Sequence, residues 1–98
     1  MGVNTPDPVV VRIQGPVSRD DVPRLCQELS ARLAGTGATE AVCEVEALAP
    51  ADLTAVEALA RLRLTAGRHG CRIRLHEPTP ELLALLDLIG LRDLIDPG

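Results

Sequence analysis

The chain has 98 residues, a hydrophobic share of 46% and a formal net charge of −4 at pH 7. It contains no Phe, Tyr or Trp, which argues against single-stranded nucleic-acid binding by base stacking, and its acidic balance disfavours contact with a phosphate backbone. All its basic residues are Arg, so a catalytic Lys, a Schiff base and a Walker-type phosphate loop are excluded. The length fits one domain with one modest core.

No apolar run approaches the roughly 20 residues that a membrane-spanning helix needs, and the first residues have no signal-peptide core. We therefore expect a cytoplasmic protein without membrane insertion. Its cysteines, Cys26, Cys43 and Cys71, are odd in number and lack CxxC spacing. They fit neither a disulfide framework nor a zinc site, and we interpret them as small buried hydrophobic residues.

The first predicted element is a strand. Residues 1–8 form a flexible lead-in, and Val9–Gln14 then alternates apolar and polar side chains, with Val9, Val11 and Ile13 on one face. Gly15 and Pro16 end this strand, and Pro16-Val17 can begin a short second one.

The first predicted helix runs from about Asp20 to Leu33. Ser18 is a good N-cap, and Asp21 three residues later is a capping-box-like partner. The apolar residues that recur at helical spacing are Val22, Leu25, Cys26, Leu29 and Leu33. Residues 35–37 end the helix with two glycines.

The next strand and helix form the centre of the chain. Residues 41–45 predict an inner strand covered on both sides, because Val42 lies on one face and Cys43 and Val45 on the other. Asp52 is a plausible N-cap for a second helix, in which Glu57 and Arg61 are spaced to pair. The apolar stripe of that helix is expected at Leu53, Val56, Leu59, Ala60 and Leu64.

The last predicted strand and helix are identified in the same way, from alternating apolar residues and from a helix start. Residues 71–75 alternate with Cys71, Ile73 and Leu75 inward, and Thr79-Pro80-Glu81 is a strong helix start. The expected buried stripe of this helix is Leu82, Leu85, Leu86 and Ile89. Residues 91–95 form a final short segment and 96–98 a tail. Strands that alternate with helices indicate crossover connections and a parallel or mixed sheet.

Catalytic patterns are lacking. His69 and His76 stand alone, the glycines match no phosphate-binding motif, and the carboxylates are scattered. We predict no enzyme activity, no catalytic residue, no cofactor and no metal ligand. The arginines at 61, 63, 72 and 74 are interpreted as a solvated face, with a docking surface as the alternative.

Over roughly residues 9–95, and most informatively from Val45 to Gly90, the chain resembles the STAS family, which includes bacterial anti-sigma-factor antagonists and the STAS subunit of a lipid-transporting ABC complex. Asp52-Leu53-Thr54-Ala55 falls on the family's Asp-Ser-Ser-Gly, and Ala58–Leu62 on the Leu-rich segment that follows. Gly70–Leu75 and Pro80–Leu91 are similar to its later strand and closing helix. The resemblance implies an α/β fold: one STAS-like domain over residues 9–95, with four to five mainly parallel or mixed strands and about three to four helices.

The resemblance also implies a function. In the antagonists, an anti-sigma kinase phosphorylates the second hydroxyl residue of this motif, and Thr54 is the matching hydroxyl. The implied role is to bind an anti-sigma factor or serine/threonine kinase, with Thr54 phosphorylation as the switch. The implied partner-binding residues are Asp52, Leu53, Thr54, Ala55, Glu57 and Arg61.

Other interpretations stay open from the sequence. Asp52 and Thr54 are also ordinary residues at a helix N-terminus and can serve only as caps. The chain can instead be an accessory subunit that binds the ATPase of an ABC lipid transporter without a phosphate switch. A small α/β enzyme or nucleotide-binding domain is the third reading. The identity of the partner and the oligomeric state do not follow from the sequence.

Overall fold

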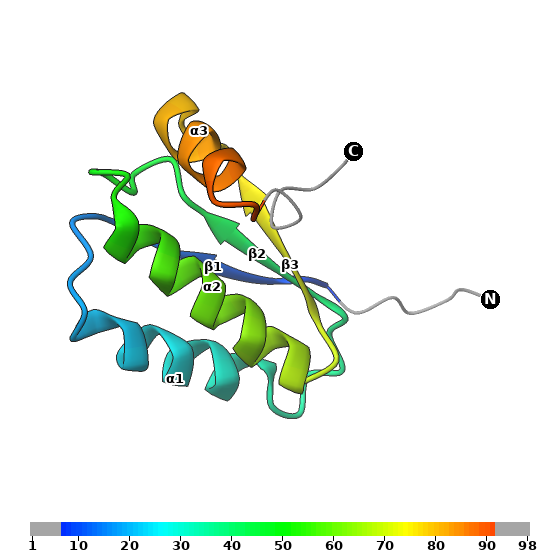
Figure 1. The fold of residues 1–98 in the computed structure, drawn as a ribbon. Coiled ribbons are helices and arrows are strands. Elements are labelled where there is room, and N and C mark those ends of the chain that lie inside the picture. The colour runs from blue at the N-terminus through cyan, green and yellow to red at the C-terminus, as the bar shows by residue number, and fades with distance from the viewer. Residues whose placement is uncertain (1–6, 92–98) are drawn as a thin grey trace.

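A computed structural model describes residues 7–91, which fold into a parallel sheet flanked by helices. Figure 1 shows α1 and α2 side by side on one face of the sheet, with α3 near the end to which the β3 arrow points. The elements in chain order are β1 (Val9–Arg12), α1 (Asp21–Leu33), β2 (Glu40–Glu44), α2 (Leu53–Arg68), β3 (Arg72–His76) and α3 (Pro80–Leu88).

The sheet has three strands in the order β1-β2-β3, and both neighbouring pairs are parallel. The prediction of an α/β fold with crossover connections is confirmed, but the described residues contain fewer strands than the four to five expected. Pro16-Val17 does not form the additional strand. Pro16 has no backbone N–H to donate to a neighbouring strand, and this segment is part of the loop that leads to α1.

The core lies between the sheet and the α1–α2 layer. Val11 of β1, Cys43 of β2 and Leu75 of β3 are in register, and all are buried beneath the helices. Leu29 of α1 and Leu59 of α2 are completely buried. Leu, Ile, Val and Ala thus fill the space that aromatic residues occupy in many domains, and no buried polar side chain of the described residues lacks a hydrogen bond.

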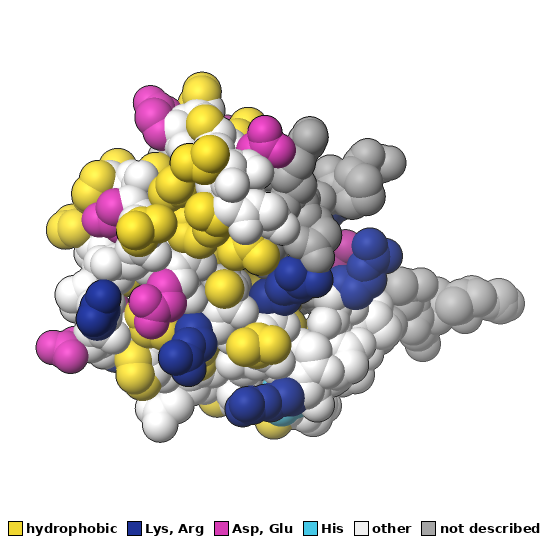
Figure 2. All heavy atoms as spheres, viewed as in Figure 1, with side chains coloured by type: hydrophobic (Ala, Val, Ile, Leu, Met, Phe, Trp, Pro, Cys, Tyr) yellow, Lys and Arg dark blue, Asp and Glu magenta, His cyan; other side chains and the backbone are white. Residues whose placement is uncertain are grey.

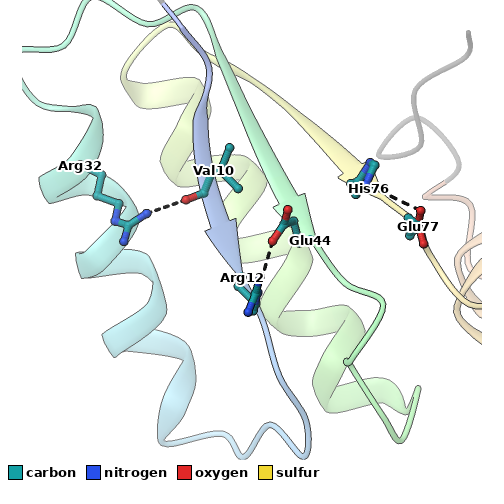
Figure 3. Close-up of polar contacts among 6 residues, drawn as sticks. All are labelled: Val10, Arg12, Arg32, Glu44, His76 and Glu77. Atoms are coloured by element: carbon teal, nitrogen blue, oxygen red, sulfur yellow. Dashed lines mark hydrogen bonds and ion pairs between the residues drawn. The ribbon is translucent and has the colours of Figure 1, made fainter.

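The opposite face of the sheet carries ion pairs around the buried Val42. Arg12 Nε lies 3.3 Å from Glu44 Oε1, and Arg74 lies 3.7 Å from Glu40 across β2 and β3. Figure 3 shows the Arg12–Glu44 pair, together with Arg32 of α1 donating a hydrogen bond to the carbonyl oxygen of Val10. β2 is the inner strand of the sheet, as predicted, with Cys43 buried on the face that α1 and α2 cover and Val42 buried among these ion pairs on the other face.

Two helix predictions are corrected by the packing. Leu53 and Leu64, which were assigned to the buried stripe of α2, are 68% and 62% exposed. Ile89, assigned to the buried stripe of α3, is also exposed because it follows the end of that helix. The buried stripe of α2 is instead Ala55, Val56, Ala58, Leu59, Leu62 and Ala66.

Several sequence predictions fall partly or wholly outside the described residues. They are the lead-in at 1–8, of which the structure describes residues 7 and 8, the short segment at 91–95, of which it describes only Leu91, and the tail at 96–98. Among residues 7–91, no helix combines the length and the apolar character that crossing a membrane requires.

Candidate functional site

The start of α2 is a capped helix end at the rim of the sheet. Asp52 has extended backbone angles, and its Oδ1 accepts a hydrogen bond of 2.9 Å from the Ala55 N–H. The Asp52 carbonyl oxygen accepts from the Val56 N–H at 3.1 Å. Asp52 is therefore the N-cap that the sequence predicted, and its carboxylate lies at the positive end of the helix dipole.

The loop that carries this helix start is tied to the loop after β1. The Gly15 N–H donates to the carbonyl oxygen of Ala47 at 3.0 Å, and a Cβ on Gly15 would lie 2.0 Å from the carbonyl oxygen of Ala49. On the other side, the Val45 N–H donates to the carbonyl oxygen of His76 at 3.1 Å. Backbone contacts to both neighbouring segments thus fix where α2 begins.

Two of the predicted partner-binding residues form an exposed pair at this position. Leu53 is 68% exposed although it is a large apolar residue, and Thr54 beside it is partly exposed. No described residue forms a hydrogen bond with the Thr54 hydroxyl. An exposed apolar side chain, and a hydroxyl that residues 7–91 leave without a hydrogen bond, therefore lie next to the Asp52 carboxylate at the helix end.

The remaining predicted partner-binding residues divide into two groups. Ala55 is only 1% exposed and packs into the core, so its side chain is not part of the exposed surface. Its backbone N–H makes the capping bond to Asp52, so this residue supports the helix start from inside. Glu57 is partly exposed and Arg61 exposed, but these two described residues form no ion pair, contrary to the sequence prediction.

A groove lies between α1 and α2, with its α2 side running from Glu57 to Arg68, and sequence reasoning missed it. It has a volume of about 350 Å³. Its lining comes from both helices and from a residue in the turn that leads into α1: Arg19, Val22, Pro23, Cys26, Glu57, Arg61, Leu64, Thr65 and Arg68. Local spacing gives no signal for such a groove, because it depends on how two helices lie side by side.

Figure 2 shows the surface around this helix. Hydrophobic side chains gather over α3 and the start of α2, and arginine and acidic side chains are mixed with hydrophobic ones lower on the same face. The arginines of the groove only partly coincide with the expected basic set, since Arg61 lines the groove but Arg72 and Arg74 lie on the open face of the sheet.

The described histidines take part in ordinary surface contacts. His69 Nε2 and Ser30 Oγ share a hydrogen bond of 2.9 Å that joins the ends of α1 and α2. His76 Nε2 lies 3.8 Å from a carboxylate oxygen of Glu77, as Figure 3 shows. Within residues 7–91, no cluster of His, Cys, Asp or Glu side chains has the arrangement that would hold a metal ion.

The cysteines are free thiols in three environments. Cys43 is buried, and burial raises the pKa of its thiol to about 12, so the thiol stays protonated and unreactive at neutral pH. Cys71 is buried as well, and its Sγ donates to the carbonyl oxygen of Ala38 at 2.9 Å. Cys26 is partly buried and is one of the residues that line the groove.

The entrance to α1 has its own polar cluster, away from the start of α2. The Asp21 carboxylate accepts hydrogen bonds from the N–H and the hydroxyl of Ser18 at 2.9 and 3.0 Å. These bonds, together with Arg24, lower the pKa of the Asp21 carboxyl. Asp21 is thus bonded to Ser18 as predicted, but Ser18 is not the N-cap of α1. The helix begins at Asp21, its N-cap is Asp20 without a side-chain capping bond, and the Ser18 hydroxyl is used by the Asp21 carboxylate.

Comparison with known proteins adds one assignment. No curated protein matches the chain. The family model described as "Mlab, STAS domain" matches residues 3–96, nearly the whole chain, and the match includes the strand, cap and helix that form the candidate site. The chain therefore belongs to the STAS domain family.

Proposed function

We propose that this chain is a non-catalytic regulatory domain that binds an anti-sigma factor or serine/threonine kinase through the start of α2. Membership of the STAS family supports a regulatory or binding role in general. The observation that carries the proposal is the exposed Leu53 beside the free Thr54 hydroxyl, on a helix end that backbone contacts hold in place. Hydrophobic side chains gather over α3 and the start of α2 (Figure 2), and gathered apolar side chains on a surface are typical of a protein–protein contact.

Phosphorylation of Thr54 is the proposed switch. The partly exposed hydroxyl has no hydrogen bond to a described residue, so a kinase would break none of those contacts by modifying it. A phosphate adds about −1.5 to −2 charges next to the Asp52 carboxylate. The helix N-terminus tolerates that charge. A partner packed on Leu53 would be released, because an acidic surface repels the phosphate and an apolar surface would have to desolvate it.

The second candidate function is an accessory subunit of an ABC-type ATPase in lipid transport. One observation favours it: where the family motif has a first hydroxyl residue, this chain has Leu53, which is 68% exposed. Permanent interfaces are more hydrophobic than transient ones, so a leucine in place of a hydroxyl residue favours a lasting contact. This function would use the same surface of α2 without phosphorylation.

One purification separates the two functions. The tagged chain and a Thr54→Ala variant are purified from the cells that naturally make the protein, and intact mass and co-purifying proteins are measured for both. A kinase or anti-sigma factor that binds the wild-type chain, together with a phosphate that Thr54→Ala lacks, supports the first function. A co-purifying ATPase with no phosphate on either chain supports the second. Turnover of a nucleotide or ester by both chains would contradict both.

A further inference from the structure

The groove between α1 and α2 follows the length of α2 over several turns. Glu57, Arg61, Leu64 and Arg68 follow one another at helical spacing along α2, and Val22 and Cys26 face them from α1. From Glu57 to Arg68, α2 rises by roughly 16 Å at about 1.5 Å per residue. That length corresponds to about three turns of a helix laid along the groove.

The charge of the groove is opposite to that of the chain as a whole. The chain has a net charge of −4, yet the groove carries three guanidinium groups, from Arg19, Arg61 and Arg68, against the single Glu57 carboxylate. Within residues 7–91, none of these three arginines forms an ion pair or a side-chain hydrogen bond.

The other arginines make the contrast clear, because several of them are already engaged with carboxylates. Arg12 pairs with Glu44, Arg24 pairs with Asp21, and the remaining pairs are Arg32 with Glu28 and Arg74 with Glu40. The groove thus gathers arginines whose charge the described part of the chain does not balance.

Apolar side chains line the groove together with these charges. Leu64 is 62% exposed near the middle of the groove, and Val22 and Cys26 lie opposite on α1. An exposed leucine flanked by arginines fits a partner that is apolar along one stripe and anionic beside it. A small anion would satisfy the arginines and leave the leucine in water.

We infer that this groove binds an acidic amphipathic helix of the partner protein, with its apolar stripe on Leu64 and its carboxylates on Arg61 and Arg68. The inference rests on the proposed function, since it names the chemistry of the partner for the same outer face of α2. Arg61 and Arg68 are seven residues apart, about 10 Å along the helix. Matching carboxylates on the bound helix are therefore also about seven residues apart, on either side of a Leu, Ile or Met.

Fluorescence anisotropy with a synthetic peptide tests this inference. The probe is a labelled amphipathic helix with leucines at every third or fourth position and Glu beside them at heptad spacing, and its control has Lys in place of each Glu. The full-length chain is compared with the double variant Arg61→Glu/Arg68→Glu and with Leu64→Ser. Arg72→Glu is the matched control, because Arg72 is exposed on β3, outside the groove.

The expected result is binding of the Glu peptide that falls about tenfold or more in the double variant, weakens in Leu64→Ser and with added salt, and is unchanged in Arg72→Glu. Equal binding of the Lys peptide, no binding of the Glu peptide, or an equal loss in Arg72→Glu overturns the inference. Vesicles of anionic phospholipid are measured in parallel. If they bind through the same arginines and the peptide does not, the ligand of the groove is a lipid surface and the inference is wrong.

The protein that co-purifies with the chain distinguishes this inference from the proposed function. If Leu53→Asp abolishes that complex and Arg61→Glu/Arg68→Glu leaves it intact, the groove inference fails and the proposed function stands. If the double variant weakens the complex and Leu53→Asp does not, the groove is the docking site and the proposed role for the start of α2 fails.

Discussion

The two faces of α2 differ in composition and in what they contact. The inner face consists of Ala and aliphatic residues, all buried against the sheet: Ala55, Val56, Ala58, Leu59, Leu62 and Ala66. The outer face alternates charges with two exposed leucines, Leu53 and Leu64. Burial of the inner face stabilises the fold, whereas the exposed leucines contribute little to it. The outer face is thus available for binding, and variants on the two faces should have separable effects.

The largest expected effect is at the centre of the inner face. Leu59→Ala removes a completely buried side chain and leaves a cavity under α2, so the free energy of unfolding should fall by about 2–5 kcal/mol. Leu64→Ala, the same change on the outer face, should cost less than about 1 kcal/mol. Urea denaturation followed by circular dichroism measures both. Similar losses for the two variants would remove the distinction between the faces.

The next effect concerns the loop contact that positions α2. A Cβ at residue 15 would lie 2.0 Å from the carbonyl oxygen of Ala49, and backbone atoms cannot move aside as a flexible side chain does. Gly15→Ala should therefore destabilise the fold by about 1–3 kcal/mol. Gly67→Ala is the control, since a Cβ there meets no atom within 4 Å. Unchanged stability of Gly15→Ala would mean that the two loops are not in contact.

A smaller effect is expected at the cap. Asp52→Ala leaves the Ala55 N–H without its side-chain acceptor and should cost about 1 kcal/mol. Asp52→Ser retains an acceptor oxygen and should recover most of that loss. Thermal unfolding monitored by circular dichroism compares the two. Equal loss in Ala and Ser variants would show that Asp52 acts on the fold by a route other than capping.

The smallest effect on stability is expected on the outer face at Thr54. Thr54→Glu places an acid in the first turn of α2, where the helix dipole favours negative charge. The free energy of unfolding should change by less than about 0.5 kcal/mol, while the affinity for the co-purifying partner falls. Thr54→Gln, similar in size but neutral, is the control for charge. A loss of several kcal/mol in Thr54→Glu would assign Thr54 to the core.

Structural features that depend on neighbouring residues, such as strand faces and helix caps, were predicted well from the sequence. The alternation of β1 placed Val11 and Ile13 in the core, and Thr79 caps α3 by accepting from the Leu82 N–H at 3.2 Å. Asp52 was identified as a cap for the same reason, because capping depends on residues three apart. The sequence alone therefore predicts a contact when the two residues that form it are no more than a few positions apart in the chain.

Features that depend on two distant segments were missed. Apolar residues of α2 point in most directions around the helix axis. Helical spacing alone therefore allowed a buried stripe through Leu64 as well as the stripe through Leu62 that the structure shows. The short side chains of Ala55, Ala58 and Ala66 decide the matter, since they let α2 lie close to its neighbours. The Gly15–Ala49 contact and the α1–α2 groove likewise arise only when separate segments meet.

The most direct test of a docking role for the start of α2 is the affinity of Leu53→Asp for the co-purifying partner, measured by isothermal titration calorimetry beside thermal unfolding of the same sample. Leu53 is largely exposed, and an acid at the first position of a helix is well tolerated, so Tm should stay within a few degrees of wild type. We predict that Kd rises about tenfold or more. An unchanged Kd would show that partners bind elsewhere, and a collapse of Tm would show that Leu53 belongs to the core.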